Sequence, residues 1–231
     1  MNFVLEGRLS GWVKRAVSLA AKDIRCELRT RYALNALAMF AVITLVVVGL
    51  TVGQNIESPL LHAALIWIVI LFSSLQALAA SFIKEEEANT ADTLRIFAEP
   101  AVIYTGKLLF SLTLMGFLLI ILIPLYVVLM DLDVPTYSGF LLCILLGSIG
   151  IASATTIIAA IVSKASIKSA LFAVLSFPIL LPVLLSAISA TEVVLRGGNL
   201  GETWSYLKIL IAYPVIVITF SYILFEYVWS D

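Results

Sequence analysis

The sequence predicts an all-α integral membrane protein with six transmembrane helices and an N-terminal amphipathic helix at the membrane surface. Of the 231 residues, 62% are hydrophobic and 13% are charged. Soluble domains are closer to half apolar and a quarter charged, so the composition excludes an ordinary soluble fold. The apolar residues also gather in runs of about 20, the length that crosses a bilayer. Residues 1–231 are therefore treated as one transmembrane domain.

Residues 10–31 are predicted to form an interfacial helix, preceded by a leader without periodicity, Met1–Leu9. An apolar stripe runs along one side of this helix and a basic polar face along the other: Val13, Val17, Ala20, Ile24 and Leu28 against Lys14, Ser18, Lys22, Arg25 and Arg29. This pattern suits the headgroup region and anionic membrane lipid. Asp23 and Glu27 fit the pattern poorly, although Glu27 can pair with Arg31. The alternative is a cytosolic helix packed on a partner protein.

Six apolar stretches are long enough to span the membrane. Their approximate bounds are Tyr32–Gly53, Leu60–Ile83, Leu108–Met130, Ser138–Ser163, Ser169–Ala190 and Tyr206–Phe225. With six spans, both termini share one side with the connections 84–107 and 164–168. Of the fourteen Lys and Arg residues, all but Arg196 and Lys208 lie on that side. Basic residues favour cytoplasmic loops, so both termini are predicted to be cytoplasmic.

The connection 84–107 is the only long polar break between two predicted spans. Its sequence has the pattern of a short, capped amphipathic helix. Asn89 can act as an N-cap, with Asp92 three residues on in a near match to a capping box. Three apolar residues then share one helix face, and Pro100 is predicted to stop the helix: Leu94, Phe97 and Ala98. We therefore expect a short amphipathic helix that another protein can bind.

The sequence lacks the residues of an autonomous enzyme or an ion-driven carrier. No charged residue lies in the middle of a predicted span, where ion sites and proton relays are found. Gly106-Lys107 matches only the tail of a phosphate-binding loop, so ATPase activity would have to reside in a partner. Cys26 and Cys143 suggest neither a disulfide nor a metal site. The net charge of −1 gives no attraction to nucleic acid.

For several residues within the spans, the sequence is compatible with more than one role. Small residues in the fourth span predict close helix packing, a subunit interface or the wall of a substrate path: Gly147, Ser148, Gly150, Ala152 and Thr156. Pro178 and Pro182 predict a kinked fifth helix, which is either structural or part of a transport path. His62, the only histidine, is either an ordinary interfacial residue or a ligand of metal or haem. A substrate contact stays open for His62 and Gln76.

Several stretches carry a resemblance to a known family. They run in order over most of Lys22–Ala187: KDIRCELRTR at 22–31, LIWIVILFSSLQALAASFIKEEE at 65–87, GKLLF at 106–110, LLGSIGIASATT at 145–156 and FPILLPVLLSA at 177–187. The architecture resembles the transmembrane subunit of a type-2 ABC exporter. The stretches are similar to the CcmB family, haem exporter protein B of bacterial cytochrome c maturation. One departure is Asn89-Thr90, where related permeases often have Gly-Thr or Gly-Ser.

The resemblance implies a permease subunit in the bacterial inner (cytoplasmic) membrane. Such a subunit couples ATP hydrolysis by a partner to haem export or to release of a haem-loaded periplasmic chaperone. The implied partners are a cytosolic ABC ATPase (CcmA-like), haem-handling membrane subunits (CcmC-like and CcmD-like), the periplasmic chaperone (CcmE-like) and a second copy of this chain. Haem is expected as possible cargo and ATP acts through the partner, with no cofactor bound directly.

The leading hypothesis is that a coupling helix at about Asn89–Glu99 docks in a groove of the ATPase. The residues predicted to couple the two proteins are Glu85, Glu86, Glu87, Asn89, Asp92, Leu94, Arg95 and Phe97. The acidic run is alternatively a solvated helix end. Two other functions stay open: a type-2 ABC exporter permease for lipid, glycan or drug, and a non-transporting scaffold of the same complex.

Overall fold

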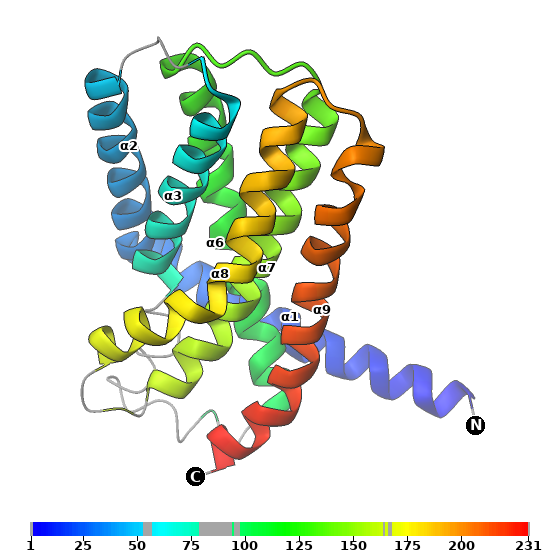
Figure 1. Ribbon diagram of the computed structural model, residues 1–231. Helices are drawn as coiled ribbons and strands as arrows, with labels where there is room; N and C mark the ends of the chain where they lie inside the picture. Colours follow the sequence, from blue (N-terminus) through cyan, green and yellow to red (C-terminus); the bar gives the residue numbers. More distant parts are fainter. Residues whose placement is uncertain are drawn as a thin grey trace.

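The structure is a computed structural model that describes residues 2–52, 57–78, 94, 98–163, 165 and 168–230. All regular secondary structure within these residues is α-helical. The helices are α1 (Asn2–Thr30), α2 (Tyr32–Val52), α3 (Pro59–Leu78), α6 (Pro100–Leu129), α7 (Tyr137–Ser163), α8 (Lys168–Leu195) and α9 (Leu200–Ser230). Six of them run side by side as a bundle, and α1 lies across one end of it (Figure 1).

The six bundle helices are long and apolar enough to cross a membrane. This confirms the predicted all-α membrane fold with six spans. The α7 helix lies at the centre, because 72% of its span is buried compared with 22% for α2 and for α9. The core around it contains large side chains from several helices, among them Trp67, Tyr126 and Phe140. The outer helices therefore present broad apolar surfaces to lipid or to other subunits.

The two ends of the bundle differ. One end, called here the α1 end, holds α1, the first residues of α6 and α8, and the last residues of α7 and α9 (Figure 1). The opposite end holds the end of α2, the start of α3, and the turns between α6 and α7 and between α8 and α9 (Figure 1). At the last of these turns, Gly197 has a φ of 77° and ends α8, and the N–H of Gly198 donates to the Val193 carbonyl. This is the usual glycine end of a helix.

The α1 helix differs from its predicted form in two ways. It begins at Asn2 rather than at residue 10, because nothing in Met1–Leu9 stops a helix and the isolated glycines Gly7 and Gly11 are tolerated within one. It also has three faces rather than two. Ala16, Leu19, Ala20, Asp23 and Glu27 lie against the bundle, whereas the predicted stripe residues Val13, Val17 and Leu28 are about half exposed. Asp23 and Glu27 therefore belong to a packing face that the sequence pattern did not separate from the apolar stripe.

The α6 helix also corrects one prediction. It begins at Pro100, not at Leu108, so residues 100–107 belong to the bundle and not to the connection. The predicted stop at Pro100 depends on residues 95–97, which lie outside the described part of the chain. Proline suits the first helical position because its φ is already helical and its missing N–H would have had no partner there. The polar connection between α3 and α6 is shortened accordingly and ends at Glu99.

Candidate functional site

The α1 helix packs closely on the first turns of α6. At Gly106 a Cβ atom would lie 2.8 Å from Cδ2 of Leu19 and 3.0 Å from its Cβ. The α1 residues on either side of this contact, Ala16 and Ala20, are small and fully buried. Small residues of this kind let two helix backbones approach each other. Gly106-Lys107, which matches the tail of a phosphate-binding loop, is thus a helix-packing site in this chain.

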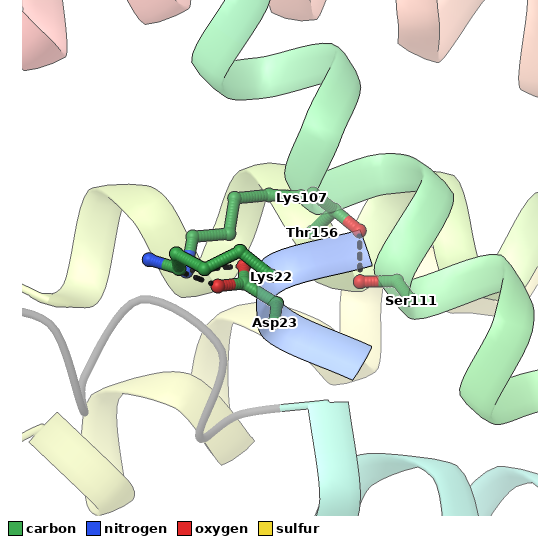
Figure 2. A network of polar contacts seen from close by, with 5 residues as sticks. All are labelled: Lys22, Asp23, Lys107, Ser111 and Thr156. Atoms are coloured by element: carbon green, nitrogen blue, oxygen red, sulfur yellow. Dashed lines mark hydrogen bonds and ion pairs between the residues drawn. The ribbon is translucent and has the colours of Figure 1, made fainter. Parts of the chain in front are cut away.

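A buried ion pair joins the same two helices. Nζ of Lys107 lies 2.9 Å from Oδ2 of Asp23, and the two side chains are 3% and 8% exposed. Lys22 contacts the other carboxylate oxygen at 3.1 Å, but its side chain is 46% exposed. Figure 2 shows both lysines reaching the one carboxylate. A buried charge is costly unless it is paired, so this pair constrains where α1 can sit on α6.

Glu27 joins α1 to the next helix. Its Oε1 accepts hydrogen bonds from the backbone N–H groups of Ala33 and Leu34, the latter at 3.1 Å. These groups belong to the first turn of α2, where backbone donors lack helical partners. A carboxylate at this position caps the helix and also suits the positive end of its dipole. Arg31 adopts a φ of 54° at the turn between the two helices.

Two further hydrogen bonds tie the start of α6 to the rest of the bundle. Thr156 Oγ1 on α7 donates to Ser111 Oγ, one helical turn beyond Lys107, at 2.9 Å (Figure 2). Thr105 Oγ1 and the Tyr222 hydroxyl on α9 lie 2.6 Å apart. The first three turns of α6 are therefore connected by polar side chains to α1, α7 and α9.

The end of the connection between α3 and α6 rests on an apolar cluster. This inner cluster is formed by Ile103, Tyr104, Leu108, Ile157, Ile158, Ala159, Ala160, Val162, Phe172, Phe225 and Trp229. Leu94 and Ala98 are half-buried against it, and the Ala98 N–H donates to the Leu94 carbonyl. Glu99, the last residue before α6, pairs with Arg15 of α1 at 3.9 Å. The connection thus ends as a packed turn, at least from Ala98 onward.

Most residues of the predicted coupling helix lie outside the described part of the chain. These are Glu85, Glu86, Glu87, Asn89, Asp92, Arg95 and Phe97. Only Leu94 of the set is described, and its half-buried side chain contacts the inner cluster of its own chain. Contact with a partner ATPase stays a prediction for all eight residues.

The small residues of α7 lie against neighbouring helices of the same chain. A Cβ on Gly147 would lie 2.2 Å from Cη2 of Trp67, and one on Gly150 would lie 2.7 Å from Cγ2 of Val183. Trp67 in turn donates its indole N–H to Thr191 of α8 at 2.9 Å. Ser148 and Ala152 are buried. The sequence left open helix packing, a subunit interface or a substrate wall; the contacts of these two glycines are those of packing within one chain.

Pro178 and Pro182 lie within α8, whose first part runs across the bundle before the helix turns along it (Figure 1). Proline has no N–H to donate and distorts the preceding turn. The hydroxyl of Tyr213 on α9 donates to the carbonyl of Ile179 at 2.6 Å, and Ser186 donates to the carbonyl of Pro182 at 2.9 Å. Hydroxyl groups from α9 and from α8 itself thus donate to two carbonyls close to the prolines.

His62 lies at the end of the bundle opposite α1. Its Nδ1 is 3.2 Å from the Tyr126 hydroxyl, which also donates to the His62 carbonyl at 3.1 Å. Both residues are buried, so the His62 ring packs inside the bundle. Gln76 is exposed near the other end of α3. Within the described ranges, no three His, Cys, Asp or Glu residues are grouped as a metal site would require.

Sequence reasoning missed the residues that hold the α1 end together, namely Asp23, Glu27 and Lys107. A usable signal was present: two acids four residues apart on a helix otherwise rich in basic residues. Acids at i and i+4 share one helix face. Their poor fit to the amphipathic pattern indicated that this face meets a donor elsewhere in the chain, although the pattern could not identify that donor.

Comparison with known protein families shows to which family the chain belongs. A model of the CcmB family, described as CcmB protein, matches residues 14–225. The chain belongs to the CcmB family. The match covers the described bundle from the middle of α1 to near the end of α9, so it includes the α1–α6 contact and all of the inner cluster except Trp229. No curated protein compared with the chain matches it.

Membership of the CcmB family makes the chain a membrane permease component of the haem-exporter ABC transporter in cytochrome c biogenesis. The family implies a complex that includes an ATPase partner. It is a permease family rather than a catalytic one. Six apolar helices agree with a multi-pass membrane protein. The functional question is therefore how a chain of this family binds the ATPase and how ATP hydrolysis changes the position of its helices.

Proposed function

We propose that this chain couples ATP hydrolysis by a cytosolic ABC ATPase, CcmA-like, to haem export or release of the haem-loaded chaperone. The α1 end faces the cytoplasm in this proposal, because the basic residues concentrate there and such residues favour the cytoplasmic side. Both termini are then cytoplasmic and the membrane is the bacterial inner membrane. The connection between α3 and α6 becomes the docking segment for the ATPase.

The observation that carries the proposal is the packing at the end of this connection. Leu94 and Ala98 lie against the inner cluster, which is built from α6, α7, α8 and α9. The chain then passes through Glu99 directly into α6. A partner that moved this segment would therefore move α6 and press on the centre of the bundle. A loosely attached loop could not transmit such a displacement.

Haem handling is assigned to the partner subunits in this proposal. The described residues group no three His, Cys, Asp or Glu side chains as a metal-ion site would need, and the one histidine is packed against Tyr126. The chain would transmit the ATP-driven movement, while CcmC-like and CcmD-like subunits hold haem and a CcmE-like chaperone receives it. A second copy of the chain would complete a symmetric arrangement with the two sites of an ABC ATPase dimer.

A pair of variants in the connection tests the docking role. Phe97→Asp and Arg95→Glu are expected to lower the ATPase recovered with tagged chain by about tenfold, a loss of about 1.4 kcal/mol of binding free energy. Leu94→Asp is a poorer test, because Leu94 also packs inside the chain. Glu57→Gln, at an exposed site on the opposite end, is the matched control.

Formation of c-type cytochromes is measured in the same cells. If both variants retain the ATPase at wild-type level, the docking role is wrong. If they lose the ATPase and still mature cytochromes normally, the chain acts as a scaffold and not as a coupling subunit.

A further inference from the structure

The buried pair between α1 and α6 has a role beyond holding the fold. We propose that Asp23 and Lys107 are positioning residues that transmit movement of the start of α6 to α1. This inference rests on the proposed function, because it concerns how the chain uses a displacement that the ATPase supplies. The pair would set the register between the two helices while they move as one unit.

Energetics alone do not explain why a charged pair occupies this place. A buried ion pair gains little over a well-packed apolar pair, because the desolvation of both charges offsets their attraction. Breaking it by removing one partner is expensive, however. Lys107 and Asp23 are almost fully enclosed, so the two helices are held in one relative position and resist separation. Such a contact suits transmission better than an apolar surface that can slide.

The pair also lies at the centre of a chain of contacts that reaches four helices. On α6, Lys107 follows Gly106, which receives Leu19 of α1, and precedes Ser111 by one turn. Ser111 accepts the hydrogen bond of Thr156 on α7. On α1, Asp23 precedes Glu27 by one turn, and Glu27 caps α2. A shift of α6 is thereby passed to α1 and α2 on one side and to α7 on the other.

The second cation at Asp23 provides a matched control. Lys22 contacts the same carboxylate, but it is half exposed and belongs to the same helix as Asp23. It therefore adds no connection between α1 and α6 through this carboxylate. Removing Lys22 leaves the interhelical pair in place, whereas removing Lys107 breaks it.

The test compares full-length variants expressed with the partner ATPase in cells that lack the chromosomal copy. Asp23→Asn and Lys107→Met break the pair, and Lys107→Arg and the exchange Asp23→Lys with Lys107→Asp keep it. We measure the ATPase recovered with the chain and the c-type cytochrome formed per ATP hydrolysed. The two breaking variants are expected to bind the ATPase and to lower that ratio by about tenfold, within the range by which single residues alter coupling.

The rescue variants and the control show whether the ion pair transmits movement from α6 to α1 or only stabilises the fold. Lys107→Arg, the exchanged pair and Lys22→Met are expected to retain most of the wild-type ratio. The combination Asp23→Leu with Lys107→Met replaces the pair by packed apolar groups and is expected to fold. If it folds, binds the ATPase and keeps the wild-type ratio, the inference is overturned. If wild-type chain binds no ATPase at all, the proposed function fails instead.

Discussion

Gly147→Val is expected to prevent correct packing of the bundle. Even a Cβ atom at this position would lie 2.2 Å from Cη2 of Trp67, which is fully buried. Trp67 has no space to move into, because its indole N–H is held by Thr191 of α8. Overpacking of a tight core typically costs about 1–3 kcal/mol and occasionally more, and a contact this short favours the upper end of that range. We expect a clear loss of monodisperse protein in detergent and a lower thermal unfolding midpoint, measured by size-exclusion chromatography and tryptophan fluorescence.

A second glycine in a membrane helix provides the control for this prediction. A Cβ on Gly116 of α6 would meet nothing within 4 Å. Gly116→Ala should therefore raise stability slightly, because alanine favours the helix by up to about 1 kcal/mol relative to glycine. Equal behaviour of Gly147→Val and Gly116→Ala would show that the contact between Gly147 and Trp67 is not as close as described.

Lys107→Met is expected to have the second largest effect on stability. It leaves Asp23 buried with only the half-exposed Lys22 beside it. Breaking a buried ion pair from one side costs about 3–5 kcal/mol, and the remaining contact with Lys22 favours the lower end of that range. We expect a lower thermal midpoint in detergent than for the wild-type chain.

A double variant shows whether the lost stability comes from an unpaired charge or from lost packing. Combining Lys107→Met with Asp23→Leu removes the unpaired carboxylate and is expected to restore most of the lost stability. If the single and double variants unfold at the same temperature, the cost arises from lost packing of the lysine stem and not from an uncompensated charge.

The spans could be predicted from the sequence because they depend on local composition. Each is a predominantly apolar run of about 20 residues, and an apolar helix is a form in which the backbone can cross the hydrocarbon core of a bilayer. The prediction failed where a polar residue is buried by the protein itself. Lys107 interrupts the apolar run and placed the start of the third span at Leu108, whereas α6 begins at Pro100. The ion pair that makes the lysine tolerable was not visible in the local pattern.

The contacts at the α1 end depend on residues far apart in the chain. Asp23 meets a lysine 84 positions later, and Gly147 receives a tryptophan from another helix. Periodicity places residues on a helix face but does not identify what that face contacts. The same limit explains why Gly106-Lys107 resembled a fragment of a nucleotide site. Its residue types, small and cationic, suit equally a close helix contact and a buried ion pair.

The central claim is that this CcmB-family chain transmits ATP-driven movement through its α1 end. The most direct measurement is purification of tagged full-length chain in mild detergent, with identification of the bound proteins and a Soret absorption spectrum. The account predicts an ABC ATPase in the purified complex, with haem absorption that disappears when the haem-handling subunits are absent. A purified chain that carries haem alone and binds no ATPase would contradict it.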